Sequence, residues 1–181
     1  MLSIEFNPII FLGVVVVARL CNLFVAWFTH FLLHQNVLGI PLYKIHLNSH
    51  HRIEYNMYSR SDYYWAISEH FTWGLFFISS LSVYHLLFSS WVEWTFCIDA
   101  VVNMLTLYYL HAEYGNKESW LSRYSWFKKD RLLHKIHHSY DKTRFMKSKN
   151  YAFGGLIAGH LMDRLFGTYQ AIKNLKSITS Q

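Results

Sequence analysis

Nine histidines at helical spacing are the residues of this chain that could do chemistry. His30 and His34 form an i, i+4 pair, and His46, His50 and His51 form an i, i+4, i+5 set. His111 stands alone, and His134, His137 and His138 form an i, i+3, i+4 set. Residues three or four apart share one face of a helix. Imidazole binds Zn, Cu, Fe and Ni, and one zinc ion takes about three or four protein ligands. Nine imidazoles are too many for one ion and indicate two.

The chain lacks the residues that three other kinds of metal site require. The chain has two cysteines, Cys21 and Cys97, and both lie inside apolar runs. They offer neither a CxxC zinc pattern nor a disulfide framework, and an iron–sulfur cluster needs cysteine ligands. The chain contains no HExxH sequence, so a metalloprotease would lack its general base.

The composition is that of a membrane protein. The 181 residues are enough for a single domain, residues 1–181, and 52% of them are hydrophobic while only 15% are charged. Charged residues make up about a quarter of a typical soluble domain. The net charge of +6 would suit nucleic acid, but the cations gather at the borders of apolar runs rather than along one face. We therefore expect a membrane as partner and no nucleic acid.

Three apolar segments must position the histidines, and they cover about residues 7–34, 63–88 and 91–111. A membrane crossing takes about 20 helical residues. We expect an all-α integral membrane protein with three transmembrane helices and a His-rich helical cap over residues 112–170. This topology places all nine histidines on one side, together with sixteen of the seventeen Lys and Arg residues. By the positive-inside rule that side is cytoplasmic.

The four histidine groups resemble those of the fatty acid hydroxylase/sterol desaturase superfamily of integral-membrane diiron enzymes. The superfamily pattern is HX3–4H, HX2–3HH, a later histidine and HX2–3HH, followed by a closing box similar to N-x-G…D-x-x-F-G-T. This chain reads HFLLH, HLNSHH, His111 and HKIHH, and its closing box runs from Asn150 to Asp163-RLFGT. Two positions depart from the pattern. The sequence HAEYGN, with Glu113, stands where many members have a further histidine, and Met162 stands where tryptophan is common.

The resemblance implies two iron ions held by the nine histidines and O2 as co-substrate. The activity implied is hydroxylation of an unactivated C–H bond of a lipid, and we favour an acyl lipid because the chain is short. A carotenoid or sterol hydroxylase, or a lipid desaturase, would use the same scaffold. Electrons would come from an external donor, namely cytochrome b5, ferredoxin or rubredoxin with its reductase. The host membrane would be a bacterial inner membrane or the endoplasmic reticulum.

Zinc outranks iron in affinity for imidazole sites, so a purified sample could hold zinc as a substitute. The alternative outside enzymology is a His-rich membrane metal transporter. A transporter needs polar ligands along a path through the bilayer, whereas these histidines gather on one side.

Further polar residues are candidates for supporting roles. We expect Asp163 and Asn150 to orient ligand histidines, and we consider His160 and Glu113 as additional ligands. Glu69 lies in the second apolar segment near the histidine side, where an ionisable residue is a functional candidate. Two ionisable residues lie deeper. Arg19 precedes His30 by eleven residues and Asp99 precedes His111 by twelve, so both lie roughly 17 Å from the metal layer, and we predict that they pair.

Overall fold

The computed structural model describes residues 7–51, 60–88, 90–116, 118–139, 147–152 and 160–172. These residues are mostly helical, and an isolated β bridge joins Val37 and Ile40. The helical class predicted from the sequence is confirmed for these ranges.

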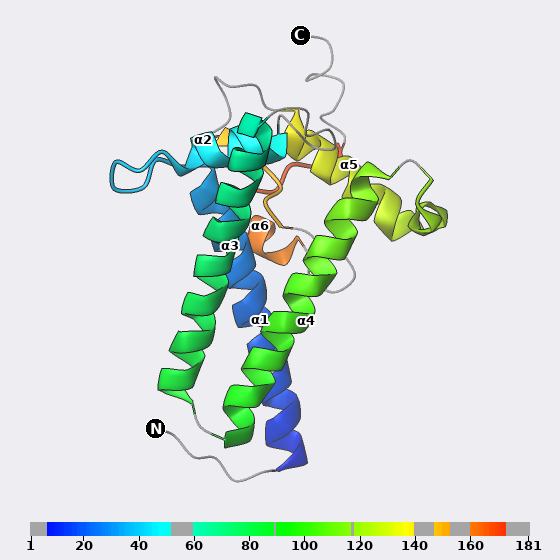
Figure 1. Cartoon of the computed structure of the whole chain (residues 1–181). Coiled ribbons are helices and arrows are strands. Elements are labelled where there is room, and N and C mark those ends of the chain that lie inside the picture. The colour runs from blue at the N-terminus through cyan, green and yellow to red at the C-terminus, as the bar shows by residue number, and fades with distance from the viewer. Residues whose placement is uncertain are drawn as a thin grey trace.

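Three long helices form the body of the molecule, and they run side by side in Figure 1. They are α1 (Pro8–Leu33), α3 (Arg60–Leu87) and α4 (Ser90–Gly115). Their bounds agree with the three predicted apolar segments to within a few residues. Asn7 caps the start of α1, because its side chain accepts hydrogen bonds from the backbone N–H groups of Ile9 and Ile10, at 2.9 and 3.4 Å. Pro8 occupies the first turn, where a backbone N–H would have no partner within the helix.

Of the helices described, α1 alone is both long and apolar enough to cross a membrane by itself. Its first half directs apolar side chains outward. Ile9 is 80% exposed, Leu12 66% and Val16 58%. A run of exposed apolar side chains of this length marks a surface that is covered by something other than water.

The half of the bundle remote from the histidines has its own apolar core. Ala18 of α1, Tyr84 of α3 and Phe96 of α4 are buried there together with Val92 and Ala100. Ala18 is fully buried, and a small side chain at this point suits the close packing of α1 against α4.

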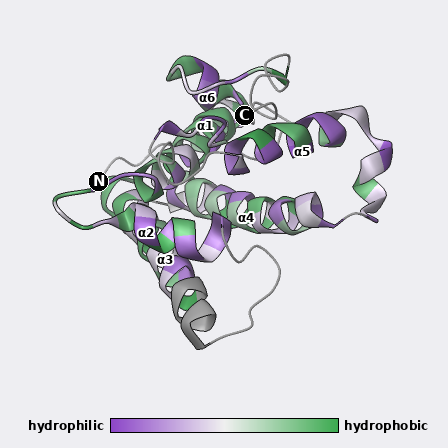
Figure 2. Ribbon diagram, turned by 90° about the horizontal axis from the view of Figure 1, so that it is seen from above, coloured by the Kyte–Doolittle hydropathy of each residue, from purple (hydrophilic) through white to green (hydrophobic). Residues whose placement is uncertain are grey.

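The cap lies across the opposite ends of the long helices, where Figure 1 shows α2 and α5. Its helices are α2 (Leu42–His46), the π-helical turn η1 (Leu47–His51), the 3₁₀ turn η2 (Trp120–Arg123), α5 (Ser125–His138) and α6 (Leu161–Leu165). Helix α5 alternates between hydrophobic and hydrophilic residues in Figure 2. Phe127 and Leu133 are fully buried while Lys128 and Lys135 are exposed. Residues 140–146 and 153–159 of the predicted cap lie outside the described residues.

Candidate metal centre

One group of four histidines is almost completely buried where α1 meets the cap. His30 lies in the last turn of α1, His34 caps that helix, His46 ends α2 and His137 lies in the last turn of α5. None is more than 1% exposed, and one nitrogen from each lies within 4.8 Å of the others. The Nε2 atoms of His30 and His46 are 3.1 Å apart, and those of His34 and His137 are 3.2 Å apart.

The hydrogen bonds of the Nδ1 atoms show that Nε2 is the nitrogen that faces the other histidines. The Nδ1 of His30 is 2.6 Å from the carbonyl oxygen of Tyr151, and the Nδ1 of His46 is 2.7 Å from Oε1 of Glu69. Carbonyl and carboxylate oxygens only accept, so both Nδ1 atoms donate. In the neutral ring each Nε2 then carries a lone pair.

Two lone pairs 3.1 Å apart repel unless a cation lies between them. Two nitrogens that bind one ion at about 2.1 Å lie about 3.0–3.4 Å apart when their angle at the ion is roughly 90–110°. The spacing of the His30 and His46 Nε2 atoms falls in that range. This donor set therefore fits a metal ion.

The second group of four lies beside the first. It draws on η1, α4 and α5, and it consists of His50, His111, His134 and His138. The Nε2 atoms of His50 and His111 are 3.2 Å apart. The structure therefore brings the nine predicted histidines together as two groups of four, with His51 placed between the groups. The Nε2 of His51 is 3.2 Å from that of His137, and its ring stacks on that of His138 at 4.2 Å.

The π-helical turn explains how neighbouring histidines serve different groups. A π-helix closes its hydrogen bonds over five residues rather than four, so His46 and His51, which are five apart, can approach the same neighbour. Both lie close to His137, whereas His50 turns toward His111. The i, i+4, i+5 spacing was visible in the sequence, but the division of its members between two groups was not.

Five histidines of the centre have lowered pKa values, so they are neutral at physiological pH. Burial, reinforced by repulsion from neighbouring imidazoles, lowers the pKa of His50, His51, His134 and His138 well below the usual value. Burial and the charge of His46 lower the pKa of His137 to about 3. Neutral imidazole is the form that binds metal.

Glu69 holds the ring of His46 in place. Its side chain is 7% exposed, and besides the bond from His46 it accepts bonds from the Ser49 hydroxyl and from Nε1 of Trp73, the latter at 3.4 Å. Glu69 therefore connects α3 to α2 and η1 through these contacts.

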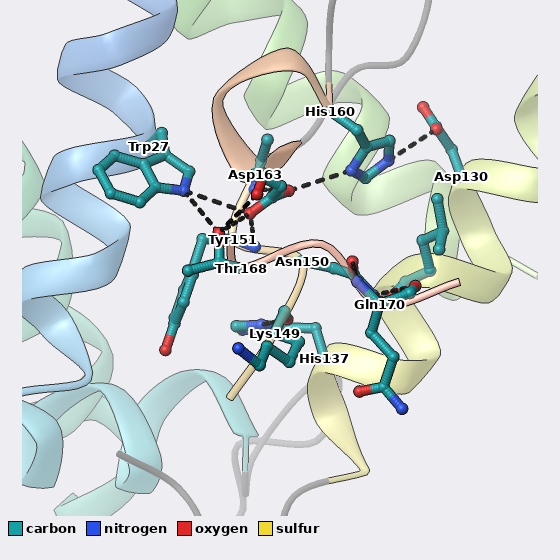
Figure 3. A network of polar contacts seen from close by, with 12 residues as sticks. Trp27, Asp130, His137, Lys149, Asn150, Tyr151, His160, Asp163, Thr168 and Gln170 are labelled. Carbon is teal, nitrogen blue, oxygen red and sulfur yellow. Dashed lines mark hydrogen bonds and ion pairs between the residues drawn. The ribbon is translucent and has the colours of Figure 1, made fainter. Parts of the chain in front are cut away.

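Asp163 organises the backbone that orients two histidines of the first group (Figure 3). Its carboxylate, which is fully buried, accepts hydrogen bonds from the N–H groups of Tyr151 and Ala152 at 2.9 and 3.0 Å. The same segment supplies the Tyr151 carbonyl that accepts from His30. Its Lys149 carbonyl lies 2.9 Å from Nδ1 of His137. Asp163 therefore acts on the first group through residues 149–152.

Asn150 fixes the same segment from its other side. Its φ of 58° lies in the left-handed region, which asparagine tolerates better than most residues. The side chain accepts from the N–H of Gln170 at 2.8 Å and donates to the carbonyl of Gln170 at 3.3 Å. A further long bond, 3.5 Å, reaches the carbonyl of Leu133 on α5.

His160 lies between two carboxylates rather than in either histidine group. Its Nδ1 is 3.1 Å from Oδ2 of Asp163, and its Nε2 is 3.1 Å from Oδ1 of Asp130 on α5. Burial alone would lower the pKa of His160, but these two hydrogen bonds outweigh it and raise the pKa to about 9. Both nitrogens are engaged, so neither is left for a metal. The suggestion of His160 as a ligand is therefore wrong for this structure, and the residue ties α5 to α6.

Asp130 was missed in the sequence, although it lies one turn before His134 on the same helix. Besides His160 it accepts from the Tyr114 hydroxyl at 3.2 Å. Glu113, in contrast, belongs to neither histidine group. Its buried Oε2 has no hydrogen-bond partner among the described residues.

Arg19 and Asp99 are brought together deep in the bundle, as predicted. The Nε of Arg19 is 3.3 Å from Oδ1 of Asp99. Arg19 also donates through Nη1 to Oδ1 of Asn103 at 2.9 Å. Asn22 donates to Asp99 at 2.9 Å and accepts from the Tyr84 hydroxyl at 2.7 Å. These polar contacts connect α1, α3 and α4.

A cavity of about 560 Å³ lies between the three long helices and reaches the histidines. At one end it is lined by His30, His46, His50 and His111, and at the other by Asn22 and Asn103. Its walls are largely apolar, with Phe77 and Met104 among them. Volumes of this size accommodate small organic ligands.

The comparisons with known proteins agree with the resemblance seen in the sequence. A family model described as fatty acid hydroxylase matches residues 15–168. No curated protein matches the chain significantly, and neither does any solved structure.

Proposed function

Because the chain belongs to the fatty acid hydroxylase family, we propose that it is an integral-membrane oxygenase that hydroxylates an unactivated C–H bond of a lipid. The observation that carries this proposal is the pair of adjoining four-histidine groups at the floor of an apolar cavity. The family assignment supports oxidoreductase chemistry, and the buried imidazoles support metal binding.

Each histidine group would hold one iron ion, and the two irons would supply the capacity to activate O2. The protein keeps the ligand nitrogens ready for them. Glu69 and the carbonyls of Lys149 and Tyr151 retain the ring N–H groups on the outside, so Nε2 of His46, His137 and His30 faces inward. Partners of this kind raise ligand basicity and fix ring orientation.

The cavity would hold the substrate with one carbon above the histidine floor. Apolar walls exclude water, which protects an oxidising site from side reactions. The lining residues extend along α1 from His30 to Asn22 and along α4 from His111 to Ala100, so an extended acyl chain would lie along these helices. We favour an acyl lipid for this reason.

Helices α1, α3 and α4 would cross the membrane with the histidine end on the cytoplasmic face. The apolar exposed surface of α1 supports a lipid environment, and the concentration of cations at the cap supports the orientation. A bacterial inner membrane or the endoplasmic reticulum would be the host. Lys128, Lys129 and Lys135 are exposed on α5, and this basic face would receive cytochrome b5, ferredoxin or rubredoxin.

The test is turnover by the full-length protein reconstituted with iron in lipid nanodiscs. It would receive a lipid extract, labelled O2, and a reductase with its electron donor, and products would be identified by mass spectrometry. We expect a lipid that has gained one labelled oxygen atom. The His34→Ala variant and the zinc-loaded protein serve as controls and should give no product.

Two other results would redirect the proposal. Loss of two hydrogens without gain of oxygen would show a desaturase, and an oxidised carotenoid or sterol would change the substrate class. Failure to form any product that depends on both iron and O2, together with metal uptake into sealed proteoliposomes, would replace the oxygenase with a metal transporter.

A further inference from the structure

The cavity has polar groups at both of its ends. Metal binding by the histidines would explain the polar groups at one end only. Asn22 precedes His30 by eight residues on α1, and Asn103 precedes His111 by eight residues on α4. At 1.5 Å per residue, the two asparagines lie about 12 Å from the histidine floor. A plain alkyl chain would need no hydrogen-bonding group at that depth.

Asn22 is satisfied by the protein itself. Both hydrogens of its amide nitrogen have acceptors, the carbonyl of Phe96 at 3.2 Å and Oδ2 of Asp99 at 2.9 Å. Its oxygen accepts from Tyr84. These bonds connect α1, α3 and α4, and they explain Asn22 without a ligand.

Asn103 is not satisfied in the same way. Arginine can only donate, so the Arg19 bond identifies the atom that faces Arg19 as the amide oxygen of Asn103, and the amide nitrogen is on the other side of the group. That nitrogen carries two hydrogens, and among the described residues it makes one long bond, 3.5 Å to the backbone carbonyl of Asn22, which can use only one of them. The residue is 6% exposed and lines the cavity. A buried N–H without an acceptor is costly in apolar surroundings.

We propose that Asn103 is a specificity residue whose amide N–H binds an oxygen of the substrate. This inference rests on the proposed function, because it places the oxidised carbon at the histidine floor. The substrate would then be a long apolar molecule with a hydrogen-bond-accepting oxygen, such as a carbonyl or hydroxyl group, about 12 Å from the carbon that is oxidised. Arg19 acts through Asn103, because it orients the amide and does not itself line the cavity.

The test measures binding, not turnover, in the zinc-loaded full-length protein in nanodiscs. The probes are palmitic acid and a series of oxo-palmitic acids in which the ketone moves by one carbon at a time. A ketone accepts hydrogen bonds and cannot donate them. We expect a narrow run of ketone positions to bind about five- to tenfold tighter than palmitic acid, which is the effect of one hydrogen bond.

Three variants locate the effect. Asn103→Asp retains an oxygen for Arg19 but removes the N–H donor, and we expect it to lose the ketone preference. Asn103→Leu should lose it as well. Ser80→Ala is the matched control, since Ser80 lines the same cavity but donates to the carbonyl of Phe77 in its own helix, at 2.7 Å, and this variant should keep the preference. Zinc content checks that each variant is folded.

Equal binding of all probes by the wild-type protein would overturn the inference, and so would a ketone preference that survives in both Asn103 variants. The proposed function stands or falls separately. A missing oxidised product from the iron-loaded protein refutes the oxygenase without changing the zinc-form binding data, while lipid hydroxylation without any ketone preference refutes only the role of Asn103.

Discussion

Replacement of Asp163 by asparagine should weaken one metal site and spare the other. Asp163→Asn keeps the shape of the side chain but leaves one oxygen where there were two. If the remaining oxygen keeps its bonds from the Tyr151 N–H and the Thr168 hydroxyl, the new NH2 group faces the N–H of Ala152 and Nδ1 of His160, and both donors lose their acceptor. A buried donor left without a partner costs about 1–3 kcal/mol, and a lost bond to a charged group costs a similar amount.

The effect on metal follows from the geometry of residues 149–152. Their carbonyls orient His30 and His137, which both belong to the first histidine group. Loss of an orienting partner lowers metal affinity by about 10–100-fold. Both of these orienting carbonyls contact histidines of the first group. We therefore expect weaker binding of one ion and unchanged binding of the other.

The assay is competition between the zinc-loaded full-length protein and a chromophoric chelator, with zinc counted by mass spectrometry. The wild-type protein should release two ions, and Asp163→Asn should release one of them at a lower chelator concentration. Glu93→Gln is the matched control, because Glu93 contacts exposed His85 at the opposite end of the bundle. A folded Asp163→Asn protein that holds both ions with wild-type affinity would refute the reasoning.

Two further predictions concern the charged pairs. Arg19→Met should lower the melting temperature because it leaves the Asp99 carboxylate without its cation. The cost should be less than the about 3–5 kcal/mol of a fully buried pair, because the Arg19 side chain is 34% exposed. The double variant Arg19→Met/Asp99→Asn should recover part of this loss, and a strictly additive double variant would contradict the pairing. His160 has a folded-state pKa of about 9, above the value of about 6.5 expected when unfolded, so its stabilisation is complete below pH 6.5 and is lost as the pH rises through 9. The melting temperature should fall across that interval by the equivalent of about 3 kcal/mol, and a His160→Gln variant that shows the same fall would refute this role.

Much of the architecture could be predicted because it depends on local spacing and polarity. Apolar runs of membrane length mark the three long helices. Arg19 and Asp99 could be paired because two helices of the same direction place residues at equal distances from their histidines at equal depth. Glu69, Asn150 and Asp163 were also visible as candidates, Glu69 because it is an ionisable residue in an apolar segment and the other two because they belong to the closing box of the family pattern.

Other features depend on contacts between segments far apart in the chain. From the sequence, His160 is at a position where a metal ligand would be plausible. In the structure Asp130 of α5 approaches its ring, so that His160 forms hydrogen bonds to both Asp130 and Asp163. The backbone carbonyls of Lys149 and Tyr151 orient the rings of His137 and His30. Every residue has a backbone carbonyl, so the sequence cannot show which ones take this role.

The sequence by itself determined that nine imidazoles gather at one end of an apolar helical chain, because helical periodicity and hydropathy act locally. Only the tertiary structure decided how they divide. The π-helical turn directs His50 toward His111 and leaves His46 and His51 near His137, and α5 supplies one histidine to the first group and two to the second. That division depends on how α1, α4 and α5 pack together, which no single segment encodes.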